Sequence, residues 1–296
     1  MGEGRTFVPG RVTILDGGLS TALLERGVTL DPQLWTGGVL LDAPEELDEV
    51  ARSFAAAGAD WVTTATYQLS VSGLLGRGLT PTSAERTLAS SARRLRAAVP
   101  AQVGIVGSIG PYGAHLGDGS EYRGDYEISS RAFADHYLPL VEALAPEVDV
   151  LAFETMPQLR ELEAILDLLA GRPLPPVWVS SSLRDPETLA DGTSLETVAH
   201  LLQSSPIVSV LGVNCCSPSW VERALEILGH AGDKPLLAYP NLGDHGPSAY
   251  LEERVPAQRD FDREQVRRWV ELGATAIGGC CGAGPSAIAE LSAMLE

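Results

Sequence analysis

The chain has 296 residues, of which 45% are hydrophobic and 20% charged, a composition that favours a globular protein with a substantial core and excludes general disorder. This length suits either two ordinary domains or one large α/β barrel. The 39 acidic and 21 basic residues give a formal net charge of -18, which repels phosphate backbones and anionic lipids, so we expect neither nucleic acid nor a membrane as partner.

Short apolar runs rich in Val, Ile and Thr alternate along the whole chain with longer stretches of helical apolar spacing. The runs predict strands at 12–17, 61–66, 103–110, 148–155, 176–182, 208–215, 235–241 and 274–280. The stretches predict helices at 83–99, 131–144, 158–171, 194–204, 219–232, 262–273 and 286–295. No long linker interrupts this order. It therefore predicts a single (β/α)8 TIM barrel domain over residues 1–296, with an open doubly wound sheet as the alternative.

Two segments are longer than a crossover between strands requires. They are 28–58 and the loop 111–128, which is rich in Gly and Tyr, and we expect both to be excursions from the barrel. In such barrels the working residues lie at the carboxyl ends of the strands. The polar residues that the predicted strands place there are Asp16, Tyr67, Ser108, Glu154, Asn214, Asn241 and three cysteines.

The chain begins without the apolar core of a secretory signal, and no run of about eighteen apolar residues follows, so we expect a cytoplasmic protein. In a reducing compartment its four cysteines are not expected to form a disulfide framework. They form two adjacent pairs, Cys215-Cys216 and Cys280-Cys281. Metal ligation and plain burial remain as explanations.

The predicted barrel places Cys215 at the end of its sixth strand and the Cys280-Cys281 pair at the end of its eighth, on one rim. Three thiolates with one open position are typical of catalytic zinc. Successive strand residues point to opposite faces, so both members of the pair can reach a metal only if the backbone leaves strand geometry, which the surrounding glycines allow. The same alternation turns Cys216 away from Cys215, and it is assigned no role.

Several motifs along the whole chain, in order, resemble the homocysteine S-methyltransferase family. They are LDGGLST (15–21), TATYQ (64–68), SIGPYGAHLGDGSEYRGDY (108–126), FETMP (153–157), GVNCC (212–216), YPNLG (239–243) and GGCCG (278–282). The resemblance implies a zinc-dependent enzyme that passes a methyl group to the thiol of homocysteine to give methionine. The segment LGDHG (242–246) departs from the pattern and bears on the choice of donor.

The resemblance also implies roles for individual residues. Cys215, Cys280 and Cys281 bind Zn²⁺, and Asp16, Gly17 and Glu154 surround the amino acid group of homocysteine. Tyr67 lies near the metal and fills its open position without substrate. The remaining predicted site residues line or cover the pocket, the tyrosines by facing a sulfonium cation with their rings: Ser108, Asn214, Tyr112, Tyr122 and Tyr126.

The third loop and YPNLG most resemble members that use a sulfonium donor, S-methylmethionine or S-adenosylmethionine. Because the sequence ends after its eighth unit, we expect neither a cobalamin module nor the extension associated with betaine enzymes. A betaine-type or selenocysteine-accepting methyltransferase remains an alternative, as does a vicinal-thiol redox sensor. A Schiff-base aldolase needs a lysine in the site, but the single lysine, Lys234, precedes the seventh strand and so falls on the opposite face.

Overall fold

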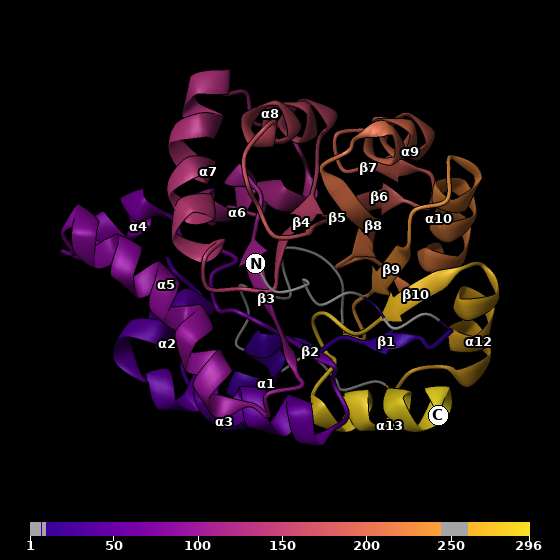
Figure 1. Ribbon diagram of the computed structural model, residues 1–296, viewed down its shortest axis with the longest axis horizontal. Helices are drawn as coiled ribbons and strands as arrows, with labels where there is room; N and C mark the ends of the chain where they lie inside the picture. The colour runs from indigo at the N-terminus through magenta and orange to yellow at the C-terminus, as the bar shows by residue number, and fades with distance from the viewer. Residues whose placement is uncertain (1–6, 8–9, 244–259) are drawn as a thin grey trace.

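The computed structural model describes residue 7 and residues 10–243 and 260–296. Eight parallel strands form one sheet in the order β1-β10-β9-β8-β5-β4-β3-β2, and a parallel bridge between Leu15 and Trp61 brings its two edges together. Figure 1 shows the resulting ring of strands with the helices outside it. The prediction of a (β/α)8 barrel is confirmed. Its strands are β1 (Thr13–Ile14), β2 (Trp61–Thr63), β3 (Gly104–Ile109), β4 (Val150–Met156), β5 (Val177–Ser181), β8 (Val208–Asn214), β9 (Leu236–Tyr239) and β10 (Ala274–Ile277).

Each predicted strand contains the observed one, except that β4 runs one residue past its predicted end at residue 155, and each predicted helix is present. In the part of the chain that the structure describes, no helix has the length and apolarity needed to cross a membrane. The helices are α1 (Leu19–Glu25), α2 (Thr36–Asp42), α3 (Pro44–Ala56), α4 (Val71–Gly76), α5 (Pro81–Ala98), α6 (Tyr112–Leu116), the 3-10 helix η1 (Ser120–Tyr122), α7 (Ser130–Leu144), α8 (Leu159–Leu169), α9 (Leu195–Ser204), α10 (Pro218–His230), α12 (Arg263–Glu271) and α13 (Pro285–Leu295).

Side chains fill the inside of the barrel, so it is a packed core and not a pore. Trp61 and Trp178 meet edge to face with their ring centroids 5.1 Å apart, and Phe7 packs on Trp178 at 5.0 Å. Gly104 makes room for this, because a Cβ there would lie 2.2 Å from the Trp61 ring. The buried inner cluster comprises Leu15, Trp61, Val106, Val150, Ala152, Trp178, Val210, Leu237 and Ala276.

Several elements were not assigned from the sequence. The long segment 28–58 contains α2 and α3, and α3 begins at a proline and buries its apolar face, including Leu47 and Phe54. The loop after β5 forms a short hairpin of β6 (Leu183–Asp185) and β7 (Thr188–Leu189). Helix α5 begins earlier than predicted because the Thr80 side chain caps it by accepting a hydrogen bond from the Ser83 N–H at 3.2 Å.

Candidate metal centre and substrate pocket

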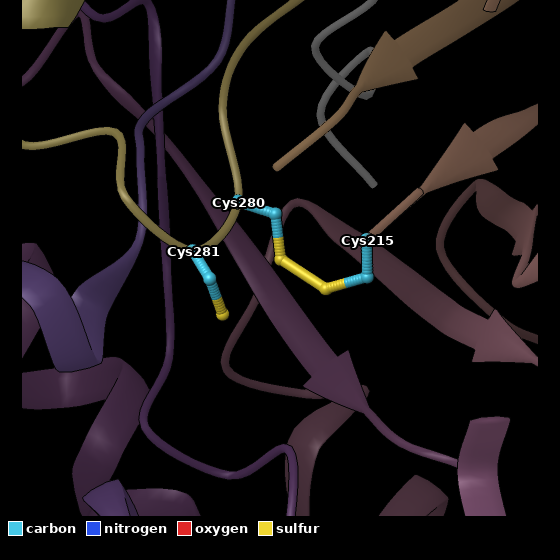
Figure 2. Close-up of side chains that lie close together, drawn as sticks. All are labelled: Cys215, Cys280 and Cys281. Carbon is cyan, nitrogen blue, oxygen red and sulfur yellow. A yellow bond between two sulfur atoms is a disulfide. The ribbon is translucent and has the colours of Figure 1, made fainter. Parts of the chain in front are cut away.

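Three cysteines converge at the carboxyl-terminal rim of the barrel. The Sγ atoms of Cys215, Cys280 and Cys281 all lie within 4.8 Å of one another. Cys215 and Cys280 are joined by a disulfide, whereas the Cys281 thiol is free of one. Figure 2 shows the joined sulfurs, with Cys281 beside them on the loop that carries Cys280. The predicted convergence is confirmed, but the disulfide was not expected from the sequence.

The backbone of Cys215 turns its side chain toward the other two cysteines. Alternation along β8 places Val210 inside the barrel, so an extended Cys215 would face the helices. Instead Cys215 has a φ of 47°, a left-handed conformation that is unusual for a residue with a side chain. Its N–H donates to the Tyr239 carbonyl at 3.2 Å. Cys216 then lies in the outer hydrophobic core, 2% exposed, and burial raises the pKa of its thiol to about 12.

The loop after β10 leaves strand geometry, as the adjacent cysteines require. The Ala283 N–H donates to the Cys280 carbonyl at 3.1 Å and closes a tight turn. Gly282 occupies the left-handed region at φ 84°, and a Cβ on it would lie 2.2 Å from the Gly243 backbone. The side chain of Asn241 accepts a hydrogen bond from the Cys281 N–H at 3.1 Å. Backbone hydrogen bonds and the turn at Gly282 therefore fix the positions of Cys280 and Cys281.

A pocket of about 610 Å³, its open mouth included, adjoins the cysteines. None of its described lining residues is basic. Most of the predicted site residues lie on its wall, and they come from the ends of β1, β2, β3, β4, β8 and β10 and from η1. These are Asp16, Gly17, Tyr67, Ser108, Tyr122, Glu154, Asn214, Cys215, Cys280 and Cys281.

Asp16, which follows β1, is one of two carboxylic acids that line this pocket, and its side chain is buried. Its carboxylate accepts hydrogen bonds from the Thr63 N–H at 2.7 Å and the Thr63 hydroxyl at 2.8 Å. Burial raises the pKa of Asp16 to about 7, although the two bonds from Thr63 lower it. Gly17 lets the next turn approach closely, since a Cβ there would lie 2.1 Å from the Ala283 carbonyl oxygen.

Glu154, near the end of β4, is the second acid. It accepts a hydrogen bond from the Ser108 hydroxyl, and burial raises its pKa while hydrogen bonds from Ser108 and Tyr239 lower it. Tyr239 in turn shares a hydrogen bond of 2.6 Å with the Ser180 hydroxyl. The charge of Glu154 also helps to raise the pKa of Asp16. The pocket is thus acidic, and it favours a ligand that carries a positive charge.

Asn214 supports the strand end that carries Glu154. Its Oδ1 accepts hydrogen bonds from the Thr155 N–H and the Ser180 hydroxyl, and its Nδ2 donates to Thr155 Oγ1, each at 2.8 Å. Thr155 has a φ of 61°, which is costly for a β-branched residue. These bonds hold the Thr155 backbone in that conformation. They also use both polar atoms of the Asn214 side chain in contacts with other residues of the protein.

Tyr67 follows β2 and lies on the pocket wall with its ring 6.0 Å from that of Trp35. Its hydroxyl is buried and has no hydrogen-bond partner among the described residues. Burial raises the pKa of Tyr67 well above its ordinary value, and the nearby charge of Glu121 adds to the effect. The phenol is therefore neutral and has hydrogen-bonding capacity to offer a ligand.

The structure separates the three tyrosines of the third loop. Tyr122 lines the pocket, but Tyr112 and Tyr126 are not among its lining residues. They lie instead around the buried carboxylate of Glu161 in α8, which accepts hydrogen bonds from the Tyr112 N–H at 2.8 Å and from the Tyr126 hydroxyl. Their ring centroids are 5.8 Å apart. This loop is anchored by two tyrosines and presents the third to the pocket.

Lys234 lies far from this chemistry. It precedes β9, on the face opposite the pocket, and its ammonium donates to the carbonyls of Leu202, at 2.8 Å, and Ser205. A Schiff-base mechanism in the pocket is therefore excluded for the one lysine of the chain.

The model of the family described as Homocysteine S-methyltransferase matches residues 13–295. The chain belongs to this family. It is 39% identical to the homocysteine S-methyltransferase of Escherichia coli over 95% of this chain and 94% of that one. It is 36% identical to the homocysteine S-methyltransferase YbgG of Bacillus subtilis, with 95% and 93% covered.

Solved structures of the E. coli homocysteine methyltransferase MmuM agree in fold. The metallated form has a TM-score of 0.86 at 38% identity and covers 96% of each chain, and the oxidized form has a TM-score of 0.85 at 39% identity and covers 95% of each. The selenocysteine methyltransferase of Astragalus bisulcatus is 30% identical, with 94% of this chain and 91% of that one covered. As a member of the homocysteine S-methyltransferase family, the present chain is a methyltransferase.

Several residues that shape the site in this member of the homocysteine S-methyltransferase family were not predicted individually from the sequence. Thr63 and Ser180 were not singled out, because single hydroxyl residues in strands give no distinctive signal. Thr155 and Tyr239 belong to the motifs FETMP and YPNLG, so those motifs were the available signal for both. Residues 244–246 of the departing segment LGDHG lie outside the described residues.

Proposed function

We propose that this methyltransferase is zinc-dependent and transfers a methyl group from a sulfonium donor, S-methylmethionine, to homocysteine. The observation that carries the proposal is the convergence of Cys215, Cys280 and Cys281 at one end of an acidic pocket. The family membership supports homocysteine as the acceptor. The name of the Astragalus relative makes selenocysteine a second acceptor to test.

The cysteines fit a zinc ion. Zn–S bonds of about 2.3 Å in tetrahedral geometry separate the sulfurs by roughly 3.8 Å, and the three Sγ atoms already lie within 4.8 Å of one another. The Cys215–Cys280 disulfide must be reduced before both sulfurs can bind as thiolates. Asn241 and the tight turn at Cys280 place the ligands without help from a metal.

A free thiol has a pKa near 8.5, so little of it is ionised at neutral pH. When bound, zinc would supply the missing activation by stabilising the thiolate of homocysteine. Asp16 and Glu154 provide negative charge for the substrate ammonium, and backbone N–H groups near Gly17 suit its carboxylate. The third loop, held at Glu161, covers the pocket and limits water. The chain thus positions and orients two substrates.

A sulfonium donor matches the remaining features of the pocket. Such a donor is cationic, in agreement with the acidic wall, and it leaves as a neutral thioether. No strong general acid is then needed, and no His, Lys or Arg is among the described lining residues. S-adenosylmethionine offers the same leaving chemistry, so the two donors must be compared directly.

The test measures metal and activity together. We expect about one zinc per chain in the reduced protein, and methionine formation from homocysteine with S-methylmethionine faster than with S-adenosylmethionine or betaine. Cys215→Ser and Cys281→Ser should lose zinc and at least 100-fold in activity. The matched control is Cys216→Ser, which replaces a core cysteine and should retain zinc.

Full activity in Cys215→Ser or Cys281→Ser would refute the zinc mechanism. Faster transfer from betaine would refute the sulfonium donor while leaving the zinc site intact. Transfer to selenocysteine in preference to homocysteine would change the acceptor alone.

A further inference from the structure

Backbone strain is concentrated at the pocket. In the part of the chain that the structure describes, three residues other than glycine have a positive φ, namely Trp35, Thr155 and Cys215, and all three line the pocket. Such conformations cost free energy and persist only where surrounding contacts hold them. Two of the three are linked through one residue, because Asn214 immediately precedes Cys215 and its side chain bonds to Thr155.

The link joins two strands that are not neighbours in the sheet. Asn214 is the last residue of β8 and Thr155 lies near the end of β4, with β5 between them. The Asn214 amide spans β5, accepting from the Thr155 N–H and donating to Thr155 Oγ1, each at 2.8 Å. From β5, the Ser180 hydroxyl donates to the same Oδ1 at 2.8 Å. All three side chains are buried, so one amide fixes two strand ends relative to each other.

The residues beside this link are the ones that the proposed reaction uses. Cys215 follows Asn214, and Glu154 precedes Thr155. Because Asn214 and Cys215 share a peptide bond, the anchored amide also fixes the start of the left-handed turn that directs the cysteine sulfur to the rim. The left-handed backbone of Thr155 in turn sets where the neighbouring Glu154 stands. Both Cys215 and Glu154 lie on the pocket wall.

Under the proposed function, these two residues hold opposite ends of one substrate. The metal bound by Cys215 holds the sulfur of the acceptor, and Glu154 holds its ammonium. The acceptor must therefore match the spacing between them. Homocysteine has two methylene groups between its α-carbon and its sulfur, whereas cysteine has one. A fixed spacing distinguishes the two amino acids, but a variable spacing does not.

We propose that Asn214 sets the spacing between the metal ligand Cys215 and Glu154, and thereby selects homocysteine over shorter and longer amino-acid thiols. This inference rests on the proposed function and deepens it. Asn214 is a positioning residue: it acts through Cys215 and Glu154, because both polar atoms of its side chain bond to other residues of the protein.

The first test uses the wild-type protein with zinc and S-methylmethionine. It compares three acceptors, which are cysteine, homocysteine and the homologue of homocysteine with one more methylene group. We expect kcat/KM to be highest for homocysteine and about 10- to 200-fold lower for either neighbour, the usual effect of one methylene group in a fitted site. Use of cysteine or of the longer thiol within threefold of homocysteine would overturn the fixed spacing.

The second test removes the link with Asn214→Ala. This variant leaves the buried Thr155 N–H without its acceptor, so the backbone beside Glu154 should shift. We expect the ratio of kcat/KM for homocysteine to that for cysteine to fall about 10-fold, mostly through a higher KM for homocysteine. An active Asn214→Ala enzyme with the wild-type ratio would overturn the role of Asn214.

The matched control is Asn241→Ala. The Asn241 side chain also accepts a hydrogen bond at this rim, but from the Cys281 N–H at 3.1 Å, in the metal half of the site. This variant should weaken zinc binding and keep the ratio between the two acceptors within twofold of wild type. An equal fall of the ratio in both asparagine variants would show that loss of any rim contact suffices, against the proposal.

A compensating change separates positioning from a general loss of stability. Glycine adopts a left-handed backbone without steric cost. Adding Thr155→Gly to Asn214→Ala should therefore restore the ratio at least threefold, although it removes a further side chain. A double variant no more selective than Asn214→Ala would overturn the argument from the Thr155 backbone.

Failure of the proposed function would look different. Wild-type protein that holds no zinc, or that methylates none of the three thiols, would refute that function. Calorimetry of homocysteine and cysteine binding to zinc-loaded protein without donor adds a readout that needs no turnover. Wild type should bind homocysteine at least 10-fold more tightly than cysteine, and Asn214→Ala less than threefold. The same preference in both proteins would refute the role of Asn214 whatever the kinetics.

Discussion

His136 shows how strongly one residue can couple stability to pH. It is buried in α7, and its ring centroid lies 4.8 Å from that of Tyr137 and 5.5 Å from that of His115. Burial and, to a smaller extent, the charge of His115 together lower the pKa of His136 to about 3. The folded state therefore holds this imidazole neutral at pH values where the unfolded chain protonates it.

Between about pH 6.5, the pKa of His136 in the unfolded chain, and about pH 3, its pKa in the folded protein, the unfolded state binds a proton that the folded state does not. The free energy of unfolding is therefore unaffected by His136 above about pH 6.5 and falls as the pH falls toward 3. We expect this residue to reduce the free energy of unfolding by about 2 kcal/mol between pH 6.5 and 5. His136→Gln should flatten this dependence in urea unfolding, whereas His200→Gln, at an exposed position of α9, should not. Identical slopes in wild type and His136→Gln would contradict the assignment.

At the scale of elements, α8 positions the third loop, residues 111–128, which carries Tyr122 to the pocket wall. Glu161 is fully buried and accepts hydrogen bonds from the Tyr112 N–H, the Tyr126 hydroxyl and, at 2.6 Å, the Tyr137 hydroxyl. Tyr112 and Tyr126 lie on either side of η1. One carboxylate thus holds both ends of the segment that contains η1, and it ties them to α7 through Tyr137.

We expect Glu161→Gln to lower the free energy of unfolding by about 1.5 to 3 kcal/mol, the usual worth of hydrogen bonds to a charged group. It should also raise the KM of the enzyme for its substrates, since this loop carries Tyr122 to the pocket wall. Urea unfolding and steady-state kinetics measure the two effects. Glu163→Gln, at an exposed position of the same helix, is the control, and equal behaviour of the two variants would rule out the anchor.

The third loop also shows where prediction from sequence stops. The motif SIGPYGAHLGDGSEYRGDY indicates a cover over the site, and η1 and α6 confirm that the segment is structured. The motif does not say which of its tyrosines face the pocket. That choice depends on Glu161, which lies 35 residues beyond Tyr126 and whose charge is buried only by tertiary packing. The same holds for Thr155, whose left-handed backbone depends on the distant side chain of Asn214.

For the whole molecule, the alternation of strand and helix patterns was sufficient to predict the barrel and the rim on which the site lies. The positions of the cysteines at predicted strand ends were also sufficient to predict that they cluster, because parallel strands bring their carboxyl ends together. The pairing of Cys215 with Cys280 could not be predicted, since a disulfide requires the two residues to lie close together after folding. Their Cα atoms are 5.5 Å apart, within the range that a disulfide spans.

The disulfide should make global stability depend on reductant. It joins residues separated by 65 positions, and chain entropy assigns a cross-link of this span about 4 kcal/mol. We expect the free energy of unfolding, measured with urea on metal-free protein, to be higher for the oxidised than for the reduced form by up to this amount. Cys215→Ser should abolish the difference and Cys216→Ser should keep it. An equal dependence on reductant in Cys215→Ser would contradict the prediction.

The bond between the sixth and eighth barrel units also changes the connectivity of the chain. In the oxidised protein, residues 215–280 form a covalent ring that includes α10, β9, α12 and β10. One cut by a protease inside that ring opens it without releasing a fragment, even after the protein unfolds. In the reduced protein the same cut yields two separate pieces. The mobility of the cut protein in a denaturing gel without reductant therefore reports which chemical state of the rim a preparation contains, and the same gel with reductant is the control.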